Sequence, residues 1–466
     1  MHRKNRPPPT PVALDGLDAD GVATGVDEKG RRWAVRGASP GAVVNAVGRR
    51  KDAFVLSVVS PPPDGVSPRC ADFRRCGGCS LQDLPLTRQQ DEKVHALVTL
   101  FAPLDAVNHG IRSSGVAYGY RDRIDLSFGT KRLLTTHELH TGVPMGGRYL
   151  GMHGAGHFDR IVPIATCHLA DDDVNAVFRA MRDDLLASPL SIHDRANHVG
   201  YLRHLVLRRG DDGVLAILTT SPGEAADEAW LRANAAAWGA ATVLWVVNEG
   251  VADVASGTLR AVLHGSGTLA ITLSGVTFAL SADAFFQVNR AGAEVLVDVV
   301  REALGAGSAG ATLIDLYCGA GALSISLAGA YAHLIGIERS ENAIADARRN
   351  AERLGVAAAY HAGTVEALLP GLALGPPDGP DGGARTSLHI VVDPPRVGLH
   401  PAALAALSRT DADVLVYVSC RATSLLRDGL ALQSAGWRCT DWWAVDLFPQ
   451  TGHVEVVARW VRNVGV

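Results

Sequence analysis

The stretch ATLIDLYCGAGALSISLA, from Ala311 to Ala328, decides the fold of this chain. Residues 312–316 form a short apolar run of strand character, and the glycine-broken turn 318–321 leads into a helix-compatible segment. A strand that feeds a glycine-rich turn at a helix N-terminus is how open α/β sheets hold nucleotide-like ligands, because glycine lets the backbone approach the ligand closely. The pattern therefore predicts a doubly wound α/β sheet with a ligand site at this turn.

The glycine turn favours one class of cofactor. It has no third glycine and no phosphate-type lysine, so it suits a nucleoside such as S-adenosylmethionine better than NAD or ATP. Glu338 ends the next strand-like run, HLIGIE, where a carboxylate is able to accept hydrogen bonds from ribose hydroxyls. A lone GxG turn is a weak signal, so this interpretation needs support from the rest of the chain.

The amino-acid composition limits the classes of protein to which this chain can belong. A chain of 466 residues with 47% hydrophobic and 20% charged residues is typical of a globular protein with two to four domains. No apolar run approaches the roughly 18 residues that span a membrane, and the basic N-terminus is not followed by an apolar segment. We therefore expect a cytoplasmic protein. Seven cysteines are too few for a disulfide scaffold in so long a chain, and the odd number favours thiol or metal chemistry.

Charge is unevenly distributed. The net charge is −4, but residues 1–75 hold 13 Lys/Arg against 8 Asp/Glu, which gives +5 there and −9 in the remainder. Such a basic module permits local contact with phosphates, although a merely solvated surface has the same composition.

The N-terminal region is predicted to form a small β-barrel. Short strand-like runs between Val12 and Val59 are separated by Asp-Gly, Lys-Gly and Pro-Gly turn signals, which predicts an antiparallel barrel after a terminal tail. The order of these runs resembles a TRAM domain, an OB-like RNA-binding barrel. The cations that are candidates for phosphate contact are Arg31, Arg32, Arg36, Arg49, Arg50 and Lys51. We expect a tail and barrel over residues 1–62, a central α+β domain over 63–283, and a catalytic domain over 284–466.

Three cysteines lie close together in PRCADFRRCGGCSLQ. Cys70, Cys76 and Cys79 form C-x5-C-x2-C with two glycines between the last pair, and Cys167 is the only other cysteine before the glycine turn. Clustered thiolates on a short glycine-containing loop are suited to a metal ion or an iron–sulfur cluster. A zinc site and unrelated free thiols are the alternatives. The spacing differs from the C-x3-C-x2-C of radical S-adenosylmethionine enzymes.

Two further runs in the central region mix aromatic and basic residues. They are GYRDR at 119–123 and YLRHLVLRR at 201–209. Such runs are found on RNA-contacting surfaces, but also on edge strands whose charges face water. Both interpretations stay open at this point.

The C-terminal part alternates strands and helices. A helix is predicted over 340–354, buried strands end at Asp393 and Cys420, and two last strands surround the Pro-Gly loop of DWWAVDLFPQTGHVEVVARW. This order predicts a class I (Rossmann-like) methyltransferase sheet with one antiparallel member.

The polar groups at the strand ends point to one reaction. Asp393, Cys420 and Glu455 lie at or beyond strand ends that meet in one crevice, and a helix predicted from Thr423 favours a thiolate at Cys420. C5 of uracil is too weak a nucleophile to accept a methyl group unaided. A thiolate that adds to C6 makes C5 enolate-like, and a carboxylate then removes the C5 proton after methylation.

In combination, the motifs resemble those of a known family. CxxxxxCGGC, FFQVN, DLYCGAG, DPPR, VSC and FPQTGHVE are similar to the bacterial 23S rRNA (uracil-5-)-methyltransferases of the RumA/TrmA type, which carry a TRAM domain and a 4Fe–4S cluster. The resemblance covers about residues 12–460. It implies the following roles: Cys420 as nucleophile and Glu455 as base; Gln287, Tyr317, Glu338 and Asp393 as S-adenosylmethionine ligands; and Cys70, Cys76, Cys79 and Cys167 as ligands of a 4Fe–4S cluster. It also implies that residues 81–114 pack with the catalytic domain.

The partner implied is RNA, with 23S rRNA favoured over the T-loop of tRNA, and we expect a monomer.

The family usually continues SCNPxTLxRD after the nucleophile, whereas this chain has SCRATSLLRD, which puts the conformation of that loop in question. DPPR also resembles the [DN]PP[YF] motif of enzymes that methylate exocyclic nitrogens of bases. That reaction would not need Cys420. A non-catalytic RNA-binding role would not need Cys420 or Glu455.

Overall fold

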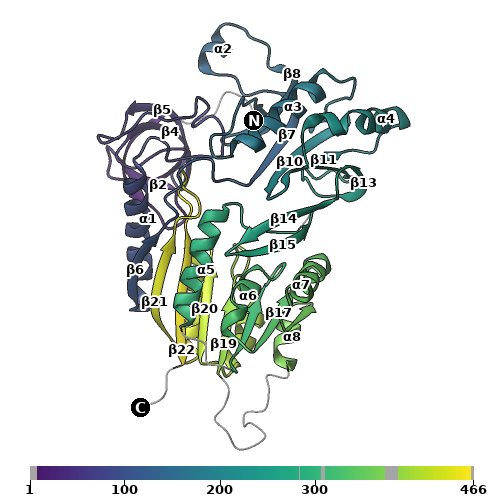
Figure 1. Ribbon diagram of the computed structural model, residues 1–466. Helices are drawn as coiled ribbons and strands as arrows, with labels where there is room; N and C mark the ends of the chain where they lie inside the picture. The colour runs from purple at the N-terminus through teal and green to yellow at the C-terminus, as the bar shows by residue number, and fades with distance from the viewer. Residues whose placement is uncertain (1–7, 283, 306–309, 373–386, 463–466) are drawn as a thin grey trace, which may run out of the picture. The chain divides into compact units, whose positions relative to one another are not determined.

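The computed structural model describes residues 8–282, 284–305, 310–372 and 387–462. The chain forms two compact units, whose elements are labelled in Figure 1. The first unit runs up to Gly16 and takes in Ala23–Leu86 and Val116–Ile271. The second consists of Leu17–Val22, Thr87–Gly115 and the chain from Thr272 on. None of the helices described is long and apolar enough to cross a membrane.

A closed five-stranded barrel lies at the start of the chain, as the sequence predicts, but it is not antiparallel throughout, because the third and fifth strands pair in parallel. The strands follow one another in the order β1-β2-β3-β5-β4 around the barrel. Alternate side chains such as Val12, Val35 and Val44 are fully buried, because successive residues of a strand point to opposite faces. The strands are β1 (Thr10–Leu17), β2 (Ala23–Asp27), β3 (Arg32–Arg36), β4 (Val43–Arg49) and β5 (Asp52–Ser60).

The rest of the first unit is built on a seven-stranded sheet in the order β13-β12-β11-β10-β7-β8-β9. Helix α3 (Asp172–Ala187) packs Val174, Phe178 and Met181 into the core of this unit. The strands are β7 (Arg123–Lys131), β8 (Gly146–Gly154), β9 (His157–Val162), β10 (Leu202–Gly210), β11 (Gly213–Thr220), β12 (Thr242–Val247) and β13 (Thr258–His264), with the short helices α2 (Thr136–His140) and α4 (Ala225–Asn234). A separate two-stranded sheet follows, made of β14 (Thr268–Leu273) and β15 (Val276–Ser281).

The second unit contains an eight-stranded sheet in the order β18-β17-β16-β19-β20-β22-β21-β6. All neighbours are parallel except β22, which runs antiparallel to both β20 and β21. The predicted sheet with one antiparallel member is therefore confirmed. The strands are β6 (Val107–Arg112), β16 (Thr312–Leu316), β17 (His333–Glu338), β18 (Ala358–Ala362), β19 (Leu388–Val392), β20 (Val414–Ser419), β21 (Trp437–Val445) and β22 (Glu455–Arg462).

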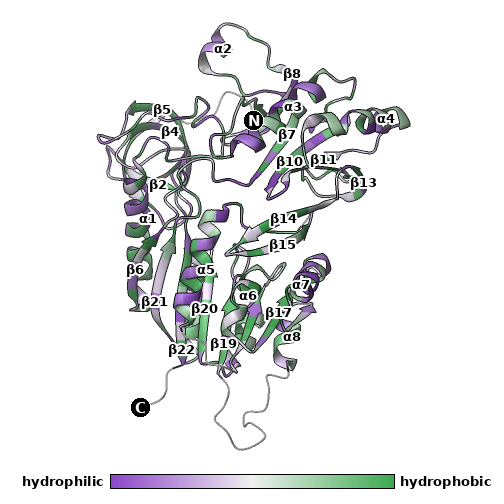
Figure 2. Cartoon of the chain, viewed as in Figure 1, coloured by the Kyte–Doolittle hydropathy of each residue, from purple (hydrophilic) through white to green (hydrophobic). Residues whose placement is uncertain are grey.

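Helices cover both faces of this sheet, which is why its central strands are continuous apolar runs. In Figure 1, α5 (Arg290–Leu304) lies against β20 and β22. Figure 2 shows β20 as hydrophobic and α7 as largely polar, in keeping with an exposed helix that buries one stripe. The other helices are α1 (Leu86–Phe101), α6 (Ala322–Ser326), α7 (Glu341–Leu354), α8 (Val365–Leu368), α9 (Pro401–Arg409) and α10 (Ala422–Ser434).

Helix α1 belongs to the second unit from Thr87 on, although its last residue, Phe101, lies about 170 residues before Thr272, where the main stretch of that unit begins. Phe101 packs edge-on against Trp442 of β21, with ring centroids 5.4 Å apart. Lys93 is fully buried, and its Nζ donates to Asp446 Oδ1 at 2.6 Å and to the carbonyl of Phe448 at 3.2 Å. Burial lowers the pKa of Lys93, while the Asp446 carboxylate acts in the opposite direction. This pair joins α1 to the loop that precedes β22.

Replacing Lys93 by methionine is expected to lower the free energy of unfolding by about 3–5 kcal/mol, because the Asp446 carboxylate would remain buried without its cation. Urea unfolding followed by tryptophan fluorescence measures the change. Arg301→Ala on α5 is the control: Arg301 forms an exposed ion pair with Asp298, and its loss should cost less than about 1 kcal/mol. An equal loss in the two variants would contradict this account.

Candidate active site

The predicted catalytic residues gather at one edge of the eight-stranded sheet. Glu338 ends β17, while Tyr317, Asp393 and Cys420 directly follow β16, β19 and β20. These strands are parallel, so their carboxyl ends meet at one edge. Glu455 begins β22 rather than ending a strand. Because β22 runs antiparallel, its first residue lies at this same edge.

The turn after β16 presents an open backbone. Gly319 has φ +54°, and a Cβ placed on it would meet no atom within 4 Å, so the main chain there is free for a ligand to approach. Tyr317 adopts φ +63°, which is uncommon for a residue with a side chain and is often found at functional sites. The helix after the turn is short: α6 covers only Ala322–Ser326.

Asp315, at the base of this turn, has an unsatisfied oxygen. Its Oδ2 accepts a hydrogen bond from the Ser324 amide at 3.2 Å, whereas Oδ1 is buried and has no partner among the described residues. Burial raises the pKa of Asp315 to about 7, and the nearby Glu338 raises it further. A buried oxygen without a donor, together with a second carboxylate beside it, fits a ligand rich in hydroxyl and amino groups, such as S-adenosylmethionine.

Two acids, a thiol and a cation face one another beyond this turn. Glu455 is 3% exposed, and burial raises its pKa to about 8, with Asp393 contributing and Arg396 opposing. Burial likewise raises the pKa of Asp393 to about 7. The sequence predicts no role for Arg396, the last residue of DPPR. In the structure it is the cation that opposes the upward pKa shifts of Glu455 and Cys420.

Cys420 is a thiol at neutral pH in this environment. Burial, together with the nearby Glu455 and Asp393, raises its pKa to about 11 against the opposing effect of Arg396. This direction is opposite to the one expected from the N-terminus of α10. Desolvation and two neighbouring carboxyl groups outweigh the helix dipole, which acts only over the first turn.

The loop before Glu455 is fixed by buried polar contacts. Gln450 has φ +69°, and its amide N–H and side chain both bond to the Gln89 side chain, at 2.8 and 3.0 Å. Asn289 donates from Nδ2 to the carbonyl of Leu447 at 2.8 Å while its Oδ1 caps α5. Gln287 lies two residues before Asn289 and is partly buried.

The four predicted cluster ligands lie near one another in the first unit. Burial raises the pKa of Cys76 to about 12, and Cys79, Cys167 and Cys70 each add to the shift. Gly78 N–H donates to Cys76 Sγ at 3.3 Å, and Asn175 bonds to both the amide and the carbonyl of Cys167. Within the described ranges, however, no three Cys, His, Asp or Glu side chains are arranged to hold a metal ion.

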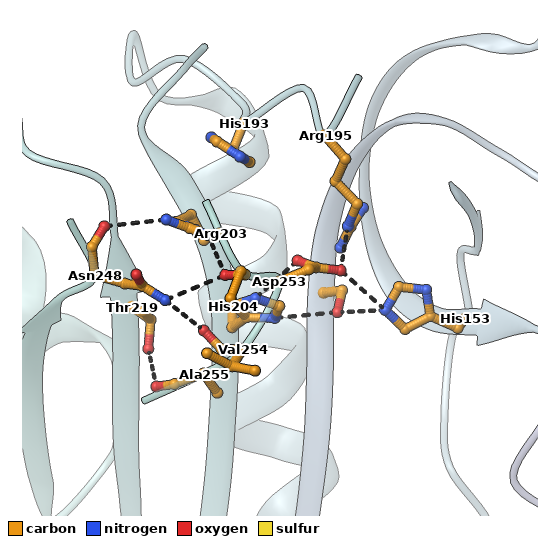
Figure 3. Close-up of polar contacts among 12 residues, drawn as sticks. His153, His193, Arg195, Arg203, His204, Thr219, Asn248, Asp253, Val254 and Ala255 are labelled. Atoms are coloured by element: carbon orange, nitrogen blue, oxygen red, sulfur yellow. Dashed lines mark hydrogen bonds and ion pairs between the residues drawn. The ribbon is translucent and has the colours of Figure 1, made fainter. Parts of the chain in front are cut away.

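The basic run 201–209 does not form a free RNA-binding surface. Arg203 is buried on β10 and donates to the carbonyls of Asn248, Gly250 and Ala252 in the loop between β12 and β13. The same loop places Asp253 between Arg195 Nε, at 2.5 Å, and His204 Nε2, at 3.0 Å (Figure 3). These cations are engaged by the protein itself, so the interpretation of this run as an RNA contact is wrong for Arg203 and His204.

The barrel cations are exposed, but several are already paired. Arg31 contacts Asp27, Arg32 contacts Asp15 and Arg36 contacts Asp52. Arg49, Arg50 and Lys51 lie exposed at the turn between β4 and β5. In GYRDR, Arg123 pairs with Asp125.

Comparison with known proteins identifies a methyltransferase domain in this chain. A family model described as "Methyltransferase domain" matches residues 308–374. An RNA methyltransferase of Chlorobaculum tepidum, itself uncharacterized, is 33% identical over 89% of this chain and 87% of its own length. One of Caldanaerobacter subterraneus is 31% identical over 96% and 97%.

A solved structure extends the likeness to the whole chain. Pyrococcus abyssi tRNA (uracil-54, C5)-methyltransferase, in complex with S-adenosyl-L-homocysteine, matches with a TM-score of 0.73 and 25% identity over 98% of this chain and all of that one. The tRNA (uracil(54)-C(5))-methyltransferase of Pyrococcus horikoshii is 29% identical over 89% of this chain. This chain is therefore an S-adenosylmethionine-dependent RNA methyltransferase and belongs to the same family as the Chlorobaculum and Caldanaerobacter proteins.

Proposed function

We propose that the protein methylates C5 of a uridine in RNA, with Cys420 as nucleophile and Glu455 as base. The observation that carries this proposal is the grouping of a thiol, a buried carboxyl group and a cation at the edge of the sheet that holds the cofactor turn. Neither transfer to an exocyclic nitrogen nor simple RNA binding requires such a thiol.

The reaction begins with addition of the Cys420 sulfur to C6, which places electron density on C5. Because the pKa of Cys420 is about 11, the thiol proton must leave to a base as the C–S bond forms; Asp393, the other carboxyl group beside the thiol, accepts it, so that Glu455 stays free to take the C5 proton. Arg396 stabilises the thiolate. Once C5 carries the methyl group, Glu455 removes the C5 proton, and the electron pair re-forms the C5–C6 double bond and expels the thiolate.

S-adenosylmethionine supplies an electrophilic methyl group when bound. Glu338, Tyr317 and Asp393 lie around the open turn at Gly319, and Gln287 lies in the segment before α5. We propose that these four residues hold the cofactor, with Glu338 accepting from the ribose hydroxyls. The partner-free Oδ1 of Asp315 provides a further acceptor at the same turn.

The substrate prediction from the sequence is a flipped uridine of 23S rRNA, because the barrel and the cysteine loop enlarge the RNA-contacting surface. The second candidate is tRNA, and the observation that favours it is the match of a tRNA enzyme along 98% of the chain, barrel included. Purified enzyme should methylate an unmodified 23S fragment in preference to a tRNA transcript, with activity falling as salt rises. A competition assay with both RNAs, analysed by nucleoside mass spectrometry, shows which of them carries 5-methyluridine. Methylation of tRNA alone would overturn the rRNA assignment and leave the uracil-C5 chemistry intact.

We also propose a 4Fe–4S cluster on Cys70, Cys76, Cys79 and Cys167. The support is that Cys167 lies near a loop that holds the other three cysteines and is bonded to β8 through Cys76 and Gly154, and that the donor set consists of thiols alone, which suits iron–sulfur chemistry.

Protein purified without oxygen is expected to contain about four irons and four sulfides per chain if these cysteines hold the cluster. Cys76→Ser should lose iron and the visible absorption of the cluster. Cys439→Ala is the control, because Cys439 is buried in the core of the second unit. One zinc per chain, or iron retained by Cys76→Ser, would contradict the assignment.

A further inference from the structure

The turn between β1 and β2 contacts the loop that carries Cys420. Its segment, Leu17–Val22, belongs to the second unit. The Asp20 carboxylate forms a two-pronged ion pair with Arg421, with Nε–Oδ1 at 2.9 Å and Nη2–Oδ2 at 3.0 Å. Thr423 Oγ1 also donates to Asp20 Oδ1, at 3.2 Å. Two side chains that directly follow the nucleophile are therefore bound to one carboxylate.

The main chain of Arg421 closes a turn around Cys420. The Arg421 amide donates to Ser419 Oγ at 3.1 Å, and Ser419 Oγ donates to the Arg421 carbonyl at 2.9 Å. Cys420 is the residue enclosed between them. Whatever fixes Arg421 therefore also fixes the direction of the Cys420 thiol.

The Asp20 carboxylate lies beside the N-terminal end of α10 and bonds to two of its side chains. Arg421 is the N-cap residue of α10, and its side chain makes no capping hydrogen bond. An Asn-Pro pair that the family usually has at this point is absent from SCRATS. A carboxylate near a helix N-terminus is stabilised by the free amides and the helix dipole. Asp20 thus supports this loop from a distant part of the chain.

The β1–β2 turn is itself rigid and also contacts the loop before Glu455. Asp18 Oδ1 accepts from the amides of Asp20, at 3.0 Å, and Val22, at 2.9 Å. Gly21 has φ +76° and packs so closely against Gly452 that a Cβ on Gly452 would lie 2.0 Å from the Gly21 carbonyl oxygen. One turn therefore abuts the loops of both the nucleophile and the base.

We propose that Asp20 is a positioning residue for the methyl-transfer reaction. Through Arg421 and Thr423 it holds the Cys420 turn in the geometry that attacks C6, while its neighbour Gly21 sets that turn against the loop leading to Glu455. Asp20 does not touch the reacting atoms. The inference rests on the proposed function of Cys420.

The test is the rate at which the enzyme forms its covalent adduct. RNA that contains 5-fluorouridine accumulates this adduct, because fluorine cannot be removed from C5 as a proton. Asp20→Ala and Asp20→Asn should slow adduct formation at saturating RNA by about 10- to 100-fold, the effect of a small misplacement of a reacting group, with the Kd for RNA changed less than about twofold. Asp298→Ala, which removes an exposed ion pair with Arg301 on α5, is the control and should react at the wild-type rate.

A double-variant cycle separates positioning from other roles. If Asp20 acts through Arg421, the variant Asp20→Ala/Arg421→Ala should be no slower than the slower single variant. An unchanged adduct rate in Asp20→Ala overturns the proposal. So does tighter RNA binding at an unchanged rate, which would mean that Asp20 only shields Arg421 from phosphates. If wild-type protein itself forms neither adduct nor 5-methyluridine, it is the proposed function that fails.

Discussion

Cys420→Ala is expected to lower the rate of uridine methylation by a factor on the order of 10⁴ or more, because no other group activates C5. The variant should form no covalent adduct with RNA that contains 5-fluorouridine, as seen on a denaturing gel. It should still bind S-adenosylmethionine, because Cys420 follows β20 and not the cofactor turn.

Cys318→Ala is the discriminating control for this result. Cys318 is the rival thiol; it is buried in the cofactor turn, and burial holds its pKa well above the ordinary value. The alanine variant should retain adduct formation. Loss of the adduct in Cys318→Ala together with its persistence in Cys420→Ala would show that the nucleophile is the other cysteine.

Glu455→Gln is expected to add to uracil and to methylate it, but to release the product about 10²- to 10⁴-fold more slowly, since the base that removes the C5 proton is missing. Unmodified RNA substrate should therefore become trapped on the variant as a methylated adduct, which mass spectrometry detects. Wild-type enzyme should show no such accumulation. A variant that turns over normally would remove Glu455 from the mechanism.

The pH dependence follows from the environment of Glu455. Burial raises its pKa from the ordinary 4.5 to about 8, so the group is largely protonated at pH 7 and becomes a carboxylate as the pH rises. Wild-type turnover should increase between pH 7 and 9. The folded protein binds this proton more tightly than the unfolded chain, so the group costs stability as pH rises from 4.5 through 8. Glu455→Gln should therefore gain thermal stability relative to wild type at pH 9 but not at pH 4.

Local sequence patterns were enough to predict the sheet that carries the site. Short patterns of neighbouring residues define the apolar run before Cys318, the glycine turn and the ends of α7. That helix is capped by Ser340 and ended by Gly355. Strand β6 could not be recognised in this way. Its residues, Val107–Arg112, are partly polar, and they form a strand because β21 offers them an edge to pair with.

The chemistry of the site was less accessible from sequence than its residues. Cys420 and Glu455 stand out as residue types, but the pKa of each is set by burial and by groups far apart in the chain. The same limit applies to YLRHLVLRR. Its alternation of apolar and basic residues resembles a strand whose charges face water, yet Arg203 is 2% exposed. Its buried guanidinium is explained only by the carbonyls of a loop 45 residues later or more.

The contribution of α1 and β6 to the second unit has a consequence for biosynthesis. The Lys93–Asp446 ion pair cannot form until Asp446 has been synthesised, 353 residues after Lys93. The apolar side of α1 therefore stays uncovered through most of translation. A fragment that starts at Thr272 would expose the edge of β21 and the face of Trp442 that Phe101 covers, and open edges with apolar faces promote association between chains. Cellular production of this unit thus depends on keeping its early segment free of aggregation until the last two strands emerge.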